Sequence, residues 1–264
     1  MLKGGFMGND FLCIADKKFK SRLIIGSGKF PSDEILLDCI KESEAEIITV
    51  AVRRVDLKNP ENSDILKVLD SSKIFIIPNT SGARNSKEAI RTAFLAREMG
   101  LSSWIKLEVV PDPRYLLPDP VETLKAAEIL VKEGFTVLPY INADPVLAKK
   151  LEDIGCATVM PLGAPIGTNK GLTTMEQIKI IVEQSNVPVI VDAGIGKPSD
   201  ACRAMELGVY ACMINTAIST SDNPAKMARA FKDAIQAGRM AYLAGLAPVR
   251  EFARASSPLE GILR

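Results

Sequence analysis

The sequence contains no histidine among its 264 residues, and this absence excludes several kinds of chemistry. Histidine is the side chain whose ordinary pKa lies near neutrality, so Ser-His-Asp catalysis, Cys-His catalysis and histidine-ligated metal sites are excluded. Acid and base catalysis must then fall to carboxylates, lysine, cysteine, tyrosine, the chain termini or the substrate. Their pKa values would have to be shifted by burial or by neighbouring charges.

Other features are scarce as well. The five cysteines are odd in number and include no CxxC pair, which is typical of structural thiols in a reducing compartment. No apolar run approaches the ~18 residues of a membrane-spanning helix, and the N-terminal stretch lacks the hydrophobic region and cleavage site of a secretory signal. We therefore expect a cytoplasmic protein.

The charge balance is nearly even. With 33 basic and 32 acidic residues the formal net charge is +1. No net field would draw such a protein to nucleic acid or to an anionic membrane, so neither is expected as a partner. A local phosphate site remains compatible with this balance.

What the sequence does contain is an alternation of short Ile- and Val-rich runs with segments of helical periodicity. The expected strands are Arg22–Ser27, Glu46–Val52, Lys73–Pro78, Trp104–Val109, Thr136–Ile141, Thr158–Leu162, Val187–Asp192 and Ala211–Asn215. The expected helices lie near residues 33–43, 63–70, 86–99, 120–133, 144–154, 173–184, 198–207 and 224–238. Start signals support several helices, namely Asp119-Pro120, Ser199 or Asp200, and Asn223-Pro224.

This alternation predicts an α/β fold with parallel strands buried on both faces, for which a closed (β/α)8 TIM-type barrel is the natural arrangement. The alternative is an open doubly wound sheet, which would need a glycine-rich dinucleotide turn after the first strand. The segment 26–30 reads GSGKF and does not match GxGxxG. We therefore expect one barrel domain over residues 1–264, with an N-terminal extension (1–21) and a C-terminal tail (239–264).

The fourth expected strand carries two charged residues on one face. Alternation along WIKLEV places Ile105, Leu107 and Val109 on one side and Lys106 and Glu108 on the other. If the apolar side packs under the helices, the lysine and the carboxylate point into the barrel mouth, where such barrels carry their chemistry. A desolvated lysine loses proton affinity and can form a Schiff base. The alternative interpretation is a buried ion pair that ties two strands together.

Asp192 ends the seventh expected strand at the same rim, either as a functional carboxylate or as a cap of the following turn. The next signals come from three loops that follow consecutive strands. They contain Gly163 to Thr168, Ala193 to Gly196, and Asn215 to Ala217. Glycine permits close backbone approach, and the loops after strands seven and eight form the usual phosphate site of a barrel. These loops therefore predict a phosphate ligand.

Two further features leave alternatives open. Arg53 and Arg54 follow the second strand and could hold an anion or pair with a carboxylate of a neighbouring subunit. The loop from Val110 to Asp119 contains three internal prolines and is either a cover over the site or a stiff connection.

Several stretches, taken in order along the chain, resemble the bacterial thiazole synthase family of thiamine biosynthesis. They include RLIIGSGKF, TVAVRRVDL, IPNTSGAR, WIKLEVV, VMPLGAPIG, VPVIVDAGIGKPSDA, INTAIS and ASSPLEGIL. The resemblance implies a (β/α)8 barrel that condenses 1-deoxy-D-xylulose 5-phosphate with dehydroglycine and sulfur into the thiazole phosphate moiety. The sulfur would come from the C-terminal thiocarboxylate of a small ubiquitin-like sulfur carrier protein.

The resemblance also implies roles for particular residues. Lys106 would form an imine with the sugar ketone, and Glu108 and Asp192 would act as acid and base. The sugar phosphate would be held at Gly167, Ala193, Gly194, Asn215 and Thr216. No metal or other cofactor is implied. A dehydroglycine-producing enzyme is expected as a further partner, and the chain is expected to form a homo-oligomer.

Two other functions are compatible with these residues. A Schiff-base aldolase acting on a sugar phosphate would share Lys106 and the phosphate loops. A catalytically silent phosphosugar-binding scaffold for the sulfur carrier would use Lys106 and Glu108 only as an ion pair. Reactivity of Lys106 separates the scaffold from the two enzymes, and dependence on a thiocarboxylate donor separates the synthase from the aldolase.

Overall fold

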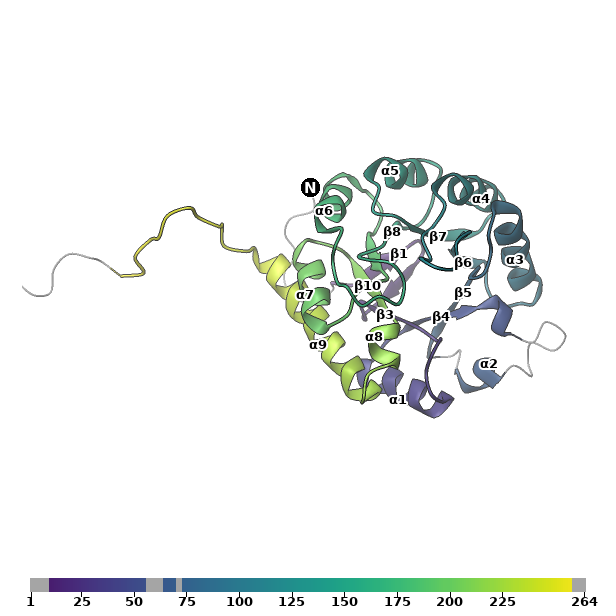
Figure 1. Cartoon of the computed structure of the whole chain (residues 1–264), viewed down its shortest axis with the longest axis horizontal. Coiled ribbons are helices and arrows are strands. Elements are labelled where there is room, and N and C mark those ends of the chain that lie inside the picture. The colour runs from purple at the N-terminus through teal and green to yellow at the C-terminus, as the bar shows by residue number, and fades with distance from the viewer. Residues whose placement is uncertain (1–9, 56–63, 70–72, 258–264) are drawn as a thin grey trace, which may run out of the picture.

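The computed structural model describes residues 10–55, 64–69 and 73–257. Within them, eight parallel strands form one sheet in the order β8-β7-β6-β5-β4-β3-β10-β9. Isolated bridges from Val159 to Val189 and from Leu162 to Asp192 join the two edges of this sheet. The helices surround the resulting ring of strands (Figure 1). The expected (β/α)8 barrel is thus confirmed, and the open-sheet alternative is excluded.

The barrel strands are β3 (Leu23–Gly26), β4 (Ile47–Ala51), β5 (Phe75–Asn79), β6 (Trp104–Leu107), β7 (Thr136–Ile141), β8 (Met160–Pro161), β9 (Ile190–Asp192) and β10 (Ala211–Ile214). The helices are α1 (Asp33–Ser43), α2 (Asp64–Val68), α3 (Ser86–Glu98), α4 (Pro120–Lys132), α5 (Pro145–Asp153), α6 (Met175–Gln184), α7 (Pro198–Glu206), α8 (Thr216–Ser219) and α9 (Pro224–Ala244), with a 3-10 turn η1 (Val52–Arg54) after β4. Each expected strand and helix has a counterpart. The ends of the expected helix 63–70 lie outside the described residues.

The helix-start signals act largely as predicted. Asp119 accepts hydrogen bonds from the backbone N–H groups of Val121 and Glu122, and Pro120 opens α4 behind it. Helix α7 differs in detail, because it begins at Pro198 and neither Ser199 nor Asp200 is its first cap. Asp200 instead lies in the first turn and accepts from the N–H of Lys197 at 3.1 Å.

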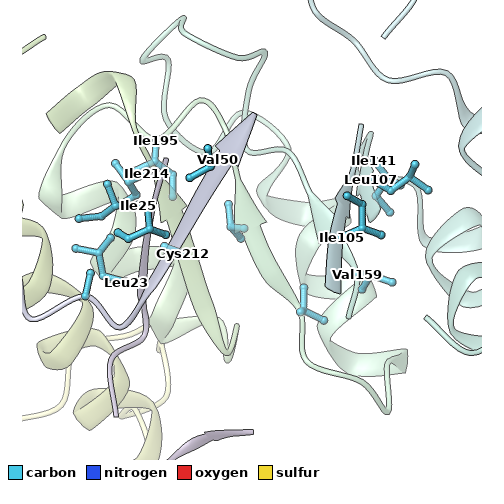
Figure 2. Close-up of a cluster of buried hydrophobic side chains, with 14 of the residues drawn as sticks. Leu23, Ile25, Val50, Ile105, Leu107, Ile141, Val159, Ile195, Cys212 and Ile214 are labelled. Atoms are coloured by element: carbon cyan, nitrogen blue, oxygen red, sulfur yellow. The ribbon is translucent and has the colours of Figure 1, made fainter. Parts of the chain in front are cut away.

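Alternation along the strands divides the apolar residues into two layers. Ile105, Leu107 and Val109 belong to the layer between strands and helices, part of which Figure 2 draws around Ile105 and Ile25. The other layer fills the barrel interior, where Trp104 packs with residues of the other strands. Lys106 and Glu108 share the inward direction of Trp104, as the period of two requires.

A feature that the sequence did not predict closes one end of the barrel. Residues Leu12–Ile14 (β1) and Lys17–Phe19 (β2) form a two-stranded antiparallel hairpin. Leu12, Ile14 and Phe19 are buried in the interior layer. The Phe19 ring contacts those of Phe75 and Trp104 at centroid distances of 5.6 and 6.5 Å. The N-terminal extension is therefore partly a plug at the end where the strands begin.

The C-terminal part also differs from expectation. Helix α9 runs to Ala244, so the first residues of the expected tail, 239–244, are helical. Residues 245–257 form neither helix nor strand and lead away from the barrel (Figure 1). Across the described ranges, no helix combines the length and the apolar character that crossing a membrane would require.

Candidate active site

The three residues predicted to carry chemistry meet inside the barrel. Lys106 Nζ lies 2.6 Å from Asp192 Oδ2 and 3.2 Å from Glu108 Oε1. Lys106 comes from β6, Glu108 follows the end of the same strand, and Asp192 is the last residue of β9. All three are buried, with 4%, 7% and 4% of their surfaces exposed. The sulfur of Met213, on β10, lies 2.9 Å from Lys106 Nζ.

One cation therefore pairs with two carboxylates at a buried position. Burial alone lowers the pKa of Lys106, but the nearby charges of Asp192 and Glu108 outweigh it and hold the pKa above its ordinary value. Burial raises the pKa of Asp192, against the attraction of Lys106, and the charge of Glu108 adds to that rise. The expectation that desolvation leaves Lys106 with less proton affinity is thus corrected, because its two partners stabilise the ammonium form.

The end of β6 is fixed by a residue that the sequence did not single out. The buried Thr80 hydroxyl accepts from the Glu108 N–H and donates to the Glu108 carbonyl, both at 2.8 Å. The Thr80 N–H also donates to the carbonyl of Lys106 at 3.1 Å. Thr80 follows β5 directly and so carries the β5–β6 pairing past Asn79. These bonds hold the backbone that carries both Lys106 and Glu108.

A cavity of about 560 Å³ opens above these residues at the ends of the strands. Its lining includes all five residues that were expected to hold phosphate: Gly167, Ala193, Gly194, Asn215 and Thr216. The structure therefore brings the expected phosphate residues and the three charged residues into one space. Their binding and catalytic roles stay predictions.

The shape of the phosphate loops depends on their small residues. Gly194 has a φ of +78°, and a Cβ there would collide with the backbone of Ala164. Ala193 has a φ of +66°, a conformation that residues other than glycine rarely adopt. Asn215 Oδ1 is buried without a hydrogen-bond partner in the part of the chain that the structure describes. Because an unpaired buried acceptor is unfavourable, this atom is suited to meet a ligand.

Lys29 is a charged residue at these loops that sequence reasoning missed. Its Nζ lies 3.4 Å from Thr216 Oγ1 and 3.2 Å from the position that a Cβ on Gly167 would take. Its backbone has a φ of +66°, which is unusual for a residue other than glycine. Lys29 is far from both partners in sequence, so no local pattern could reveal it.

The proline-rich segment 110–119 is placed over the cavity. Val110, Pro111, Pro113 and Leu116 line it. Two inward residues of β7 and its loop anchor the segment, because Tyr140 donates to the Leu116 carbonyl at 3.4 Å and Asn142 donates to the Pro118 carbonyl at 3.1 Å. Of the two interpretations left open, the contacts therefore favour a cover.

No group of three or more acidic or cysteine side chains with a geometry that could hold a metal ion occurs in the ranges that the structure describes. Burial raises the pKa of Cys156 to about 12, and the same cause raises that of Cys39 to about 11. These thiols therefore stay protonated at neutral pH and make poor nucleophiles or ligands.

Comparison with known proteins gives consistent results. The model of the family "Thiazole biosynthesis protein ThiG" matches residues 13–258. A thiazole synthase of Syntrophobacter fumaroxidans is 60% identical over 253 residues, which cover 96% of this chain and 98% of that protein. A thiazole synthase of Moorella thermoacetica is 57% identical, covering 96% and 99%.

Solved structures agree with the fold. The Amycolatopsis orientalis BexX/CysO complex contains a chain 31% identical to this one, with a TM-score of 0.82 and coverage of 94% of this chain and 100% of that chain. A thiamine phosphate pyrophosphorylase of Pyrococcus furiosus is 13% identical with a TM-score of 0.59, covering 82% and 95%. The second likeness supports the barrel fold alone.

Proposed function

Since the chain belongs to the thiazole biosynthesis protein ThiG family, we propose that its cavity condenses 1-deoxy-D-xylulose 5-phosphate, dehydroglycine and sulfur into the thiazole phosphate moiety of thiamine. The observation that carries the proposal is Lys106, buried between Asp192 and Glu108 in a cavity that the predicted phosphate loops also line. A carbonyl compound with a phosphate group would meet a lysine and two proton carriers there. The first covalent step is an imine between Lys106 and the sugar ketone.

Imine formation needs the two carboxylates. The ammonium of Lys106 passes one proton to a neighbouring carboxylate, and the free amine then adds to the ketone carbon. A second proton moves from this nitrogen to the former carbonyl oxygen. The carboxylic acid returns its proton to that oxygen, which leaves as water, and a protonated imine remains. The raised pKa of Asp192 suits this carboxylate to take up the proton and return it at this step.

The protonated imine then acts as an electron sink. It acidifies the adjacent C–H, so a carboxylate can remove that proton and deliver one to the former ketone carbon, while the hydroxyl on the adjacent carbon gives up its proton to the other carboxylate. This transfer moves the carbonyl character one carbon along the sugar, where a sulfur nucleophile can add. Glu108 and Asp192 face the same ammonium from two strands, and this arrangement is suited to moving a proton between neighbouring carbons.

The phosphate end of the sugar would lie at Gly167, Ala193, Gly194, Asn215 and Thr216. None of these carries a charge, and a phosphate monoester is close to a dianion at neutral pH. Lys29, beside Thr216, supplies the missing positive charge. It would thus fix the distance between the phosphate and the reacting ketone at Lys106.

The proposal includes partners and a setting. BexX was solved in a complex with CysO, which supports a second protein chain as a partner of this barrel, and we assign that place to a ubiquitin-like sulfur carrier. A dehydroglycine-producing enzyme would supply the third reactant. We further propose that the whole chain acts as one domain, that it functions in the cytoplasm and that it self-associates.

Borohydride trapping tests the central step. The wild type and Lys106→Ala are incubated with 1-deoxy-D-xylulose 5-phosphate, reduced and mapped by peptide mass spectrometry. We expect a covalent adduct on Lys106 that is absent from the variant. Glu108→Gln and Asp192→Asn should slow adduct formation or turnover, and full turnover in both would contradict their acid and base roles. Sugar binding without an adduct on Lys106 would refute the imine mechanism, and aldol cleavage without need of a thiocarboxylate would identify an aldolase.

A further inference from the structure

The cavity has a second basic side, away from the phosphate loops. Arg53 and Arg54 follow β4 in η1, and Arg84 follows β5. All three line the cavity. In the closed order of eight strands, β4 lies opposite β8 and β5 lies opposite β9. The arginines therefore face the phosphate loops across the barrel mouth, with Lys106 on the strand next to β5.

None of these three guanidinium groups forms an ion pair with a carboxylate of the described residues. Arg54 donates from Nη1 to the Ser27 carbonyl at 2.7 Å, so its position is explained by the loop after β3. Neither Arg53 nor Arg84 forms an ion pair with a carboxylate among the residues that the structure describes. Arg53 Nη1 would lie 3.1 Å from a Cβ on Gly82, whose φ is +101°. Because Gly82 has no side chain, the guanidinium of Arg53 can occupy this space.

A buried hydroxyl points to a ligand on the same side. Thr49 lies on β4, four residues before Arg53, and it lines the cavity. Its surface is only 3% exposed, and its Oγ1 has no hydrogen-bond partner within the described ranges. A buried hydroxyl without a partner is unfavourable. A polar group bound between Thr49 and Arg53 would remove that cost.

The charges of the lining indicate how much anion the cavity accepts. Five basic side chains line it, namely Lys29, Arg53, Arg54, Arg84 and Lys106, against the two acidic side chains of Glu108 and Asp192. The excess is three positive charges. A sugar phosphate accounts for close to two of them, since a phosphate monoester is nearly a dianion at pH 7. One further negative charge would balance the cavity.

We propose that Arg53 and Arg84, with the hydroxyl of Thr49, form a binding site for the carboxylate of a small planar α-imino acid. The assignment rests on the proposed function, in which dehydroglycine is such an acid. A guanidinium binds a carboxylate through two parallel hydrogen bonds and so fixes its orientation as well as its position. The strand next to β5 is β6, which carries the sugar imine on Lys106, so the two reactants would be held on neighbouring strands.

Oxamate is a stable planar probe for this site. The Lys106–sugar adduct is first formed and reduced, so that the phosphate side is filled, and oxamate binding is then measured by calorimetry. Arg53→Ala and Arg84→Ala are compared with the wild type and with Arg91→Ala, a matched control at an exposed position on α3 outside the cavity. We expect the oxamate Kd to rise at least tenfold in the first two variants and less than twofold in the control.

Lys29→Ala provides the opposite comparison, because it should weaken binding of the sugar phosphate more than binding of oxamate. A wild type that does not bind oxamate, or equal affinity in all variants, would overturn the proposal. The proposal would also be overturned if Arg53→Ala and Arg84→Ala weakened binding of a synthetic peptide of the carrier's carboxyl-terminal tail but not binding of oxamate. It would be overturned as well if Arg53→Ala dissociated an oligomer without changing the oxamate affinity. If the wild type forms no sugar adduct, the proposed function fails separately. Oxamate titration of the unmodified protein then still decides whether Arg53 binds a carboxylate.

Discussion

Lys106 is a reactive amine that lies beside two carboxylates, whose negative charges repel each other. Asp192 and Glu108 lie within 3.2 Å of one ammonium, in a site where all three side chains are buried. The ammonium offsets the repulsion between the two carboxylates. The negative charges of these carboxylates in turn raise the pKa of Lys106. The resting site therefore stores its amine in protonated form. The Lys106 ammonium must therefore lose a proton before its amine can attack the bound substrate.

Removing the ammonium should destabilise the fold in a pH-dependent way. We expect Lys106→Ala to lower the free energy of unfolding at pH 7 by about 3–5 kcal/mol, because it leaves two buried carboxylates without a cation. Burial raises the folded-state pKa of Asp192, and without Lys106 no cation opposes that rise. The contribution of Asp192 to stability is then present at low pH and lost as the pH rises through its folded-state pKa. The deficit should therefore shrink between pH 7 and pH 5.

Urea unfolding at pH 5 and pH 7 measures this effect, with Lys150→Ala as a control at an exposed position on α5. The control should change the free energy of unfolding by no more than about 0.5 kcal/mol. An equal deficit of Lys106→Ala at both pH values would show that its charge does not stabilise the carboxylates. In the wild type the corresponding loss belongs at alkaline pH, because the stabilisation by a raised lysine pKa disappears above 10.5, its ordinary value.

At the scale of elements, the strands and helices were predictable where one physical signal acts over many residues. The buried parallel strands read as Ile- and Val-rich runs, and Asp119-Pro120 begins α4 as the capping rule predicts. The alternation in WIKLEV was enough to place Lys106 and Glu108 inside the barrel. Residues brought together from distant segments were not predictable in this way. Lys29 meets Thr216 across 187 positions, and Thr80 meets Glu108 across 28.

The hairpin β1–β2 was missed because its strands have three residues each and the apolar run around β1 is too short to indicate a strand. The hairpin stabilises the fold by packing against the floor of the barrel, which is the end where the strands begin. We expect Phe19→Ala to lower the free energy of unfolding by about 3–5 kcal/mol, since it removes a buried ring from the cluster with Phe75 and Trp104. Lys18→Ala, at the exposed neighbouring position, is the matched control.

Borohydride trapping at a temperature where both variants remain folded should label Lys106 as in the wild type, because the plug lies at the opposite end of the barrel from the cavity. A stability loss below about 1 kcal/mol in Phe19→Ala would mean that the hairpin does not seal the floor. A loss of labelling in the folded variant would show instead that the plug positions the interior of β6.

At the scale of the whole molecule, the N-terminal and C-terminal segments differ in how they are attached to the barrel. Asp10 pairs with Arg22 at 2.8 Å and with Arg239 at 2.7 Å, and so ties the N-terminal extension to the barrel and to α9. Segment 245–257 forms no ion pair with the rest of the described chain and exposes Leu246, Val249 and Phe252. Exposed apolar side chains in an extended segment are typical of a surface that is buried in an assembly.

We expect this segment to become ordered when the sulfur carrier binds. Extended segments that fold on a partner bury their apolar side chains at that moment and acquire hydrogen bonds for their backbone amides. Hydrogen exchange of residues 246–257 should therefore slow at least tenfold on addition of the carrier, and remain unchanged on addition of 1-deoxy-D-xylulose 5-phosphate alone. The amides of α3, far from the tail in Figure 1, serve as the internal reference.

Two results would contradict this expectation. Equal exchange with and without the carrier would show that the tail takes no part in its docking. Protection that rises with the concentration of this protein, in the absence of any carrier, would assign the apolar side chains to a second copy of the chain. The variant Val249→Ser with Phe252→Ser separates these cases, because it removes apolar area from the tail without touching the cavity. It should weaken carrier binding while leaving the borohydride adduct on Lys106 unchanged.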